Sequence, residues 1–354
     1  MIEKTTLHEG VNKPRDGALS HLYTAYGNTL LALSDVECHL LALDPHTLLI
    51  GAETIQPTST PSTHLCKENA ENSLRNAVTL DATNSKAQSV LDGLLQGGGG
   101  AGMHERKPKE FVAELFDSFA DTFDDKLLKG LQYKVPKLIG EAVVELLPDG
   151  KNVYQNALDA GAGTGLAGRF LRPVVRQNLI GVDASRKMLD IAAKCTVAQG
   201  CGLESTSKSS NDKPLYDDLL VMDLEVMTVA NTLGKSSSAA ATPAVGFDLI
   251  VAADVLVYFG SLENLLNTFQ QVSTKGAMLV VSCERTTPEE APLGWRLLPS
   301  GRFAHTKQHV QEAAQKAGYE LKLYREIVPR MEKGEEVLGH LFGFELMRRP
   351  NDEL

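Results

Sequence analysis

The sequence predicts an α/β fold: a seven-stranded, mostly parallel, doubly wound sheet with an antiparallel last strand, preceded by a small α-helical region. Short apolar runs alternate with helical patterns from Val153 onward, which is typical of parallel strands joined by helices on both faces of a sheet. The first run leads into a glycine-rich loop, DAGAGTG at 159–165. The last two runs are separated only by RMEKGEE, which predicts a hairpin and therefore an antiparallel final strand.

The chain divides into segments of different composition. Residues 1–95 have a helical pattern, residues 96–107 form a glycine-rich flexible linker, and residues 108–350 form the α/β domain. Serine-rich insertions near 204–213 and 232–245 interrupt that domain and predict loops. Residues 70–95 resemble the second helix of a tetratricopeptide repeat running into the next helix, and a generic amphipathic helix pair fits them equally well.

The α/β domain begins with helical patterns near Lys109 and at 135–147, after which strands and helices alternate. The predicted strands are Val153–Leu158, Asn178–Val182, Leu219–Met222, Phe247–Ala252, Ala277–Cys283, Glu320–Val328 and Val337–Met347. Ser261 is the candidate N-cap of a helix at 261–272. Thr306 is the candidate N-cap of a helix at 306–317, which Gly318 terminates.

The composition of this 354-residue chain favours a soluble globular protein, because 43% apolar residues suffice for a sizeable core. The net charge of −10 repels polyphosphates, and no apolar run has the length of a signal peptide or a membrane span. The 5 cysteines show no paired framework, which indicates unpaired thiols in a reducing compartment. We therefore expect a cytoplasmic protein that binds neither nucleic acid nor membranes.

The loop after the first strand contains Gly161, Gly163 and Gly165 at alternate positions, with Ala162 between the first two. Glycines let the backbone pass close to a ligand, and the helix that follows offers unpaired N–H groups. A dinucleotide-binding loop requires G-x-G-x-x-G, whereas here Leu166 occupies the position of the third glycine. The loop therefore predicts a nucleotide-like ligand and disfavours a nicotinamide dinucleotide.

Acidic residues end the first two strands of the sheet. Asp159 would repel a pyrophosphate, but it suits a ligand such as S-adenosylmethionine, which carries an ammonium group and no phosphate. Asp183, followed by Ala184, can accept hydrogen bonds from ribose hydroxyls, and its spacing fits a dinucleotide site as well. Met188 either packs against an adenine or belongs to the core.

The third and fourth strands also end in polar residues. Asp223 can accept from an adenine amino group while the backbone N–H of Leu224 donates to the ring, or Asp223 is a helix cap. Asp254 and Tyr258 emerge at the carboxyl edge of the sheet, where open α/β folds bind ligands. Tyr258 either lines the ligand pocket or serves as a helix cap or core hydroxyl.

DAGAGTG resembles the first motif of class I S-adenosylmethionine-dependent methyltransferases. Three stretches, FDSFADTFDDKLLKGLQYKVP at 116–136, FDLIVAADVLVYFGSLENLL at 247–266 and GWRLLPSGRFAHT at 294–306, are similar to the predicted methyltransferases that carry N-terminal tetratricopeptide repeats. The resemblance implies S-adenosylmethionine as cofactor and helices that fold over it. The candidate lid residues are Phe116, Phe119, Phe123 and Tyr133, although the spacing of Phe119 and Phe123 fits a packed core helix equally well.

The resemblance leaves the methyl acceptor open. The candidate catalytic residues are Tyr258, Arg302 and His305: Arg302 could clamp an anionic group, and His305 could act as a base, as a donor or only as a structural residue. No metal is required, because the methyl group moves by in-line displacement from a sulfonium. We expect transfer to a small molecule, such as a carboxylate-containing metabolite. The alternatives are a protein substrate recruited by the N-terminal helices and a non-catalytic regulator that binds the cofactor.

Overall fold

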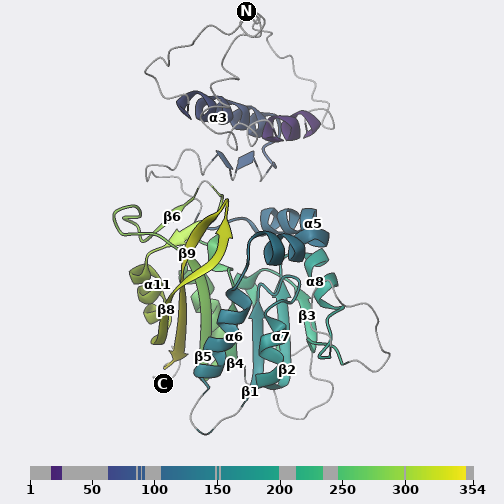
Figure 1. Cartoon of the computed structure of the whole chain (residues 1–354), viewed down its shortest axis with the longest axis vertical. Coiled ribbons are helices and arrows are strands. Elements are labelled where there is room, and N and C mark those ends of the chain that lie inside the picture. Colours follow the sequence, from purple (N-terminus) through teal and green to yellow (C-terminus); the bar gives the residue numbers. More distant parts are fainter. Residues whose placement is uncertain are drawn as a thin grey trace, which may run out of the picture. The chain divides into compact units, whose positions relative to one another are not determined.

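The computed structural model describes residues 17–25, 63–84, 87–88, 90–91, 105–147, 150, 153–198, 213–233, 246–298 and 300–347. The chain forms two compact units (Figure 1). The first comprises Met1–Met103 with Pro299–Gly301, and the second comprises His104–Leu298 and Arg302–Leu354.

The first unit contains helices, as the sequence predicts. A helix at 17–25 packs on α3 (Thr63–Leu80), where the Ser20 hydroxyl donates to the Ala77 carbonyl at 2.8 Å. Asn84 Nδ2 donates in turn to the Ser20 hydroxyl at 2.8 Å. A small apolar core of Leu74, Ala77, Ala87 and Leu91 holds these segments together. This single packed unit gives no support for a tetratricopeptide repeat.

The second unit is built on one mixed sheet. Its strands are β1 (Tyr154–Ala160), β2 (Val175–Asp183), β3 (Asp218–Val221), β4 (Phe247–Ala252), β5 (Ser273–Arg285), β6 (Trp295–Leu297), β7 (Phe303–His305), β8 (Tyr319–Glu332) and β9 (Glu335–Leu346). Strands β3, β2, β1, β4 and β5 are parallel in that order. Strand β9 is antiparallel to both β5 and β8. The predicted doubly wound sheet with an antiparallel last strand is therefore confirmed.

Helices cover both faces of this sheet. They are α5 (Lys109–Asp125), η2 (Lys126–Gly130), α6 (Val135–Glu145), α7 (Gly168–Leu171), η3 (Arg172–Val174), α8 (Arg186–Ala192), η4 (Leu224–Val226), η5 (Leu256–Tyr258), α10 (Glu263–Val272) and α11 (Lys307–Lys316). Helices α6, α7 and α8 contribute to one apolar cluster, and α6 and α7 lie on the face turned to the viewer in Figure 1. Helices α10 and α11 contribute to the cluster on the opposite face.

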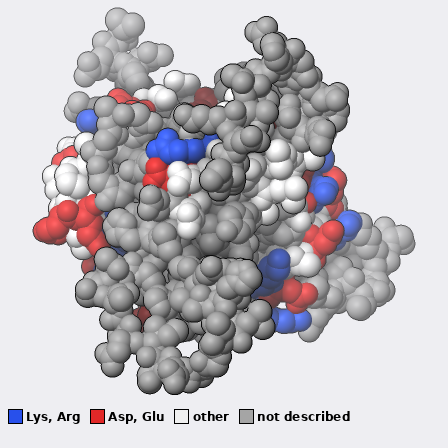
Figure 2. Space-filling model, turned by 90° about the horizontal axis from the view of Figure 1, so that it is seen from above, with Lys and Arg blue, Asp and Glu red and all other residues white. Residues whose placement is uncertain are grey.

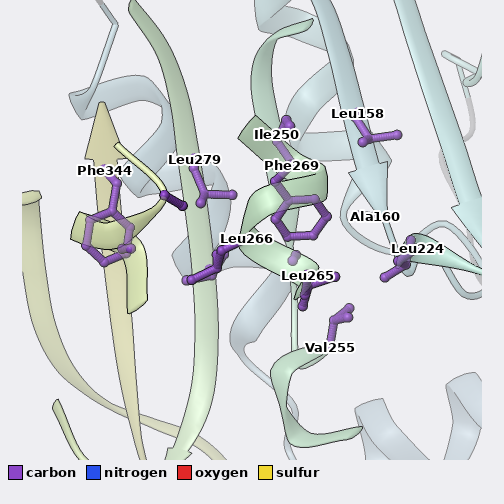
Figure 3. Packing of buried hydrophobic residues seen from close by; sticks show 14 of the residues in the cluster. Leu158, Ala160, Leu224, Ile250, Val255, Leu265, Leu266, Phe269, Leu279 and Phe344 are labelled. Carbon is purple, nitrogen blue, oxygen red and sulfur yellow. The ribbon is translucent and has the colours of Figure 1, made fainter. Parts of the chain in front are cut away.

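The cluster beneath α10 fixes the carboxyl ends of the central strands. Figure 3 shows Phe269 of α10 next to Ile250 of β4, in the same cluster as Leu158 of β1. All three side chains are fully buried. Burial of a side chain of this size contributes about 1.5–3 kcal/mol, so the strand ends that carry the candidate site continue from a well-packed core.

The caps of the two predicted helices differ. Thr306 caps α11 by accepting a hydrogen bond from the His309 N–H at 3.2 Å, and Gly318 has a φ of 84° directly after that helix, as predicted. Helix α10 instead follows Leu262 without a side-chain cap, so the prediction for Ser261 is wrong. The Ser261 N–H donates to the Glu105 carbonyl at 3.0 Å, which draws this residue into a contact with a distant segment.

The hairpin formed by β6 and β7 lies where the sequence predicts a loop. Trp295 pairs with His305, and the rings of Trp295 and Phe303 meet edge to face at 5.3 Å. Strand β7 also runs parallel to the end of β5, where Ala304 pairs with Glu284. At Glu284, β9 pairs with one edge of β5. Strand β7 pairs with the opposite edge, beyond the point where the pairing with β4 ends.

The cysteines depart from the expected unpaired thiols. Cys195 is disulfide-bonded, whereas Cys283 in β5 is a buried free thiol. Sequence spacing gave no sign of this bond because no pair of cysteines forms a recognisable motif. The expectation is therefore wrong for Cys195.

Two surface properties bear on the expected partners. Within the described ranges, none of the helices combines the length and apolar character needed to cross a membrane. On the face shown in Figure 2, described basic and acidic side chains lie interspersed.

Candidate active site

The glycine-rich loop connects the end of β1 to α7. The N–H groups of Gly161 and Ala162 both donate to the Val182 carbonyl of β2, at 2.7 and 3.0 Å. Gly161, Gly163 and Gly165 have φ values of 77°, 54° and 91°, a region that favours glycine. A Cβ atom on Gly161 would lie 2.3 Å from Val255, whereas one on Gly163 would meet nothing within 4 Å. The loop thus packs tightly on one side and borders open space at Gly163.

Asp159 is a buried carboxylate with incomplete hydrogen bonding. Only 1% of the residue is exposed, and its Oδ2 accepts from the Tyr216 hydroxyl at 2.6 Å. Its Oδ1 is buried without a partner. Burial raises the pKa of Asp159 to about 6, although the Tyr216 hydrogen bond opposes the shift. A buried acceptor without a partner is costly, so this oxygen fits a ligand that brings an ammonium group to the end of β1.

Asp183 joins the glycine loop to the start of α8. Its Oδ2 accepts from the Gly163 N–H at 2.9 Å, and its Oδ1 accepts from the Ser185 N–H at 2.8 Å. Burial raises the pKa of Asp183, while these backbone hydrogen bonds lower it. Ala184 is partly exposed, but Met188 has no exposed surface. The structure therefore places Met188 in the core beneath α8.

Helix α5 is tied to the same corner of the sheet by a residue that sequence reasoning missed. The Ser185 hydroxyl donates to Asp117 Oδ1 at 2.5 Å. The backbone N–H of Lys187 donates to the same oxygen at 3.2 Å. Asp117 therefore anchors α5 on the first turn of α8, but neither motif nor spacing identified it, because its partner lies 68 residues away.

The end of β3 is occupied by a second residue missed from the sequence. This residue is Arg106, whose Nη1 and Nη2 donate to Oδ1 and Oδ2 of Asp223 at 3.2 and 2.9 Å. Arg106 Nη1 also donates to Glu225. Leu224 between these acids is buried. Arg106 falls within the segment expected to be a flexible linker, where its charge was the only signal.

Asp254 begins an ionic network at the ends of β4 and β5. Its φ of 55° is unusual for a residue with a side chain. The Asp254 N–H donates to the Ser282 hydroxyl, which donates back to Asp254 Oδ1, each at 2.9 Å. Arg330 Nη1 lies 3.6 Å from Asp254 Oδ2, and Arg330 Nη2 donates to Glu284. Burial raises the pKa of Asp254, and Arg330 opposes that shift.

Arg302 belongs to the same network and is already paired. Its Nε donates to Glu284 Oε1 at 2.7 Å, and its Nη2 donates to Glu332 Oε1 at 2.5 Å. With Asp254 and Arg330 included, carboxylates outnumber guanidinium groups in this network. The expected clamp for an anion is therefore held by carboxylates of the chain itself.

His305 lies inside the protein rather than at the surface of the site. It has no exposed area, and its Nε2 donates to the Phe259 carbonyl at 2.8 Å. Its ring stacks on that of His309 at 5.8 Å. Burial lowers the pKa of His305 to about 3. The structure thus agrees with the structural alternative, in which His305 ties β7 to the residue after η5, and a catalytic role for His305 stays a prediction.

Aromatic rings gather beside the ionic network. Phe116 contacts Phe119, Phe123 and Tyr258, with ring centroids 5.5, 5.7 and 5.6 Å apart. These rings are only partly buried, and Phe119 has non-helical φ and ψ of −134° and 18°, which kinks α5. Burial and the neighbouring Asp254 raise the pKa of Tyr133. The site thus joins a half-buried aromatic wall to a network of charges.

Comparison with known proteins identifies a family. A family model described as a methyltransferase domain matches residues 131–322. The structure is similar to magnesium protoporphyrin IX methyltransferase from Synechocystis PCC 6803 with bound SAM, at 13% identity over 70% of this chain and 99% of that chain, with a TM-score of 0.44. It is also similar to the N-methyltransferase NodS from Bradyrhizobium japonicum WM9 in complex with S-adenosyl-L-homocysteine, at 14% identity over 67% of this chain and 99% of that chain, with a TM-score of 0.43. No curated protein sequence matches the chain.

Proposed function

Since the chain belongs to this methyltransferase family and is an S-adenosylmethionine-dependent methyltransferase, we propose that the ends of β1 to β5 hold the cofactor and a small-molecule methyl acceptor. The observation that carries the proposal is the buried Asp159 Oδ1 without a partner. Asp159 directly precedes the loop of glycines, which borders open space at Gly163. A carboxylate in this position suits an ammonium group and would repel a phosphate.

The remaining strand ends supply groups for the rest of the cofactor. Gly161, Ala162, Gly163 and Gly165 form the loop under which it lies, and Asp183 offers its carboxylate to the ribose. Ala184 borders the ribose, and Met188 supports the pocket from the core. Asp223 accepts from the adenine amino group, and the Leu224 N–H donates to the ring. These roles rest on the placement of each residue at the carboxyl edge of the sheet.

The methyl acceptor enters beside Asp254 and Tyr258. S-adenosylmethionine supplies an electrophilic methyl group on its sulfonium. The aromatic wall of Phe116 and Tyr258 aligns the acceptor and excludes water, effects that can contribute up to about 7–11 kcal/mol to such a reaction. Arg302 is paired with Glu284 and Glu332, so a carboxylate on the acceptor loses its expected partner. We therefore propose a neutral or amine-bearing acceptor.

Radiolabelled S-adenosylmethionine tests this function directly. The full-length protein is incubated with extract fractions, and labelled products are sorted by size. We expect the label in low-mass products, and we expect Asp159→Ala to abolish it while Arg325→Ala, in an exposed pair with Glu145, does not. Label that appears only in protein would contradict a small-molecule acceptor.

One observation favours a protein substrate as the second candidate. Leu19 and Leu22 lie one turn apart on the helix at 17–25, and they are 41% and 66% exposed. Exposed apolar side chains at this spacing can serve as a docking face. If this candidate is correct, replacing both leucines with serine reduces protein labelling and leaves cofactor binding unchanged.

A further inference from the structure

A short segment ahead of the family-matched region reaches the end of β3. We call Glu105, Arg106 and Lys107 the strap. The Lys107 N–H donates to the Tyr258 carbonyl at 2.8 Å, and the Gly260 N–H donates to the Glu105 carbonyl at 2.7 Å. These bonds form an antiparallel bridge between Arg106 and Phe259. The strap backbone is thus fixed to the segment that follows β4.

The strap carries one guanidinium to Asp223. Arg106 lies over the ring of Phe259, with its Cζ 5.1 Å from the ring centroid. From this position its two terminal nitrogens contact both carboxylate oxygens of Asp223. Glu225, which also faces Arg106, places a second negative charge beside Asp223. The guanidinium therefore neutralises a pair of carboxylates that would otherwise repel each other.

The hydrogen bonds to Asp223 leave a defined part of its carboxylate open. An ionised carboxylate offers about four acceptor positions, two on each oxygen. Oδ1 accepts from the Glu225 N–H at 3.1 Å and from Arg106 Nη1, while Oδ2 accepts from Arg106 Nη2. One position on Oδ2 remains, and 20% of the side chain is exposed. That position suits a single external N–H donor, such as one hydrogen of an amino group.

We propose that Arg106 is a positioning residue for the cofactor, which orients the Asp223 carboxylate so that its remaining acceptor position reads the adenine amino group. The inference rests on the proposed placement of adenine at Asp223. It assigns cofactor discrimination to a residue outside the stretch 131–322 that the family model matches. Because a lysine is a point charge and cannot make the two-pronged contact, charge alone does not substitute for Arg106.

The test compares two ligands on the full-length chain. Calorimetry measures the dissociation constants of S-adenosylhomocysteine and of its analogue in which a hydrogen atom replaces the adenine amino group. The variants are Arg106→Ala and Arg106→Lys, with Arg325→Ala as a matched control in an exposed ion pair with Glu145. Circular dichroism checks that each variant is folded.

We expect the wild type to prefer S-adenosylhomocysteine over the analogue. Arg106→Ala should weaken S-adenosylhomocysteine about tenfold or more, because an oriented charged hydrogen bond is lost, and should change the analogue much less. Arg106→Lys should not restore the preference, and Arg325→Ala should leave both affinities unchanged. In an Asp223→Ala background, Arg106→Ala should have no further effect on the preference.

If Arg106→Ala weakens the binding of both ligands equally, Arg106 has only a structural role and the proposal is overturned. An unchanged preference for S-adenosylhomocysteine in this variant would also overturn it. If Arg106→Ala does not fold, Arg106→Lys decides, since a retained preference contradicts the need for the two-pronged contact. Failure of the wild type to bind S-adenosylhomocysteine would instead refute the cofactor site itself.

Discussion

At the scale of single residues, the burial of Asp159 decides the chemistry at the end of β1. A carboxylate that is 1% exposed and has one oxygen without a partner is poised to receive a cation. Tyr216 satisfies only the other oxygen. The cofactor's ammonium group would therefore gain a charge-assisted hydrogen bond at a buried position.

Cofactor affinity should depend on pH through the titration of Asp159. The pKa of Asp159 is raised to about 6, so the carboxylate is ionised at neutral pH and protonated below that value. Affinity for S-adenosylhomocysteine should therefore fall about tenfold for each pH unit below about 6, because the bound cation must displace a proton. Calorimetry across this range measures the slope.

A matched ligand and a variant separate the titration of Asp159 from general acid denaturation. Methylthioadenosine lacks the ammonium group, so its affinity should not follow the titration of Asp159. Asp159→Asn should remove the slope for S-adenosylhomocysteine. An equal pH dependence for both ligands would contradict the assigned contact.

The burial of His305 leads to a prediction about stability rather than about catalysis. Its pKa is lowered from 6.5 to about 3, so the native state keeps it neutral while the unfolded state binds a proton below about 6.5. Its contribution to stability is therefore complete above pH 6.5 and is lost as pH falls toward 3. Between pH 7 and pH 5 this group should lower the free energy of unfolding by about 2 kcal/mol.

Urea unfolding of the wild type and of His305→Gln at both pH values measures this contribution. The variant should be less stable at pH 7 but should lose less stability on acidification. Between pH 7 and pH 5, the turnover of the variant should depend on pH in the same way as that of the wild type. A large loss of turnover with unchanged stability would instead restore a catalytic role.

At the scale of elements, one carboxylate ties helix α5 to the start of α8. Asp117 bonds both the Ser185 hydroxyl and the Lys187 N–H at the start of α8. Asp117→Ala should lower the free energy of local opening by about 1–3 kcal/mol, because the partners at the helix start are left unsatisfied. Amide hydrogen exchange should then become faster across Lys109–Asp125 and stay unchanged in α10. Unchanged exchange in α5 would show that Asp117 does not anchor it.

Elements with strong local signals were predicted well. Strand β4 has the predicted bounds, Phe247–Ala252, because an apolar run broken only by Asp248 marks a strand buried on both faces. The Thr306 cap of α11 could likewise be predicted, because it needs only a hydrogen bond from the N–H three residues later. The β6–β7 hairpin was missed, since three-residue strands give little periodicity and β7 depends on the edge of β5.

The same distinction applies to the candidate site. The acids at the strand ends follow apolar runs and could be located from the sequence, although their roles stay predictions. The pairing of Arg302 and the burial of His305 could not be foreseen, because both depend on residues brought together by the sheet. Arg106 and Asp117 were missed for the same reason: their partners lie 117 and 68 residues away.

At the scale of the whole molecule, the chain joins a helical unit to a methyltransferase unit whose sheet places polar groups along one edge. The net charge of −10 predicts that nucleic acid is not the substrate, a prediction that stays open. We expect the glycine loop and the acids at the strand ends to select S-adenosylmethionine over a dinucleotide.

Calorimetry of the full-length protein with S-adenosylhomocysteine and with a nicotinamide dinucleotide tests this claim most directly. We expect saturable binding of S-adenosylhomocysteine that Asp159→Ala abolishes, and no binding of the dinucleotide. Binding of the dinucleotide without binding of S-adenosylhomocysteine would contradict it.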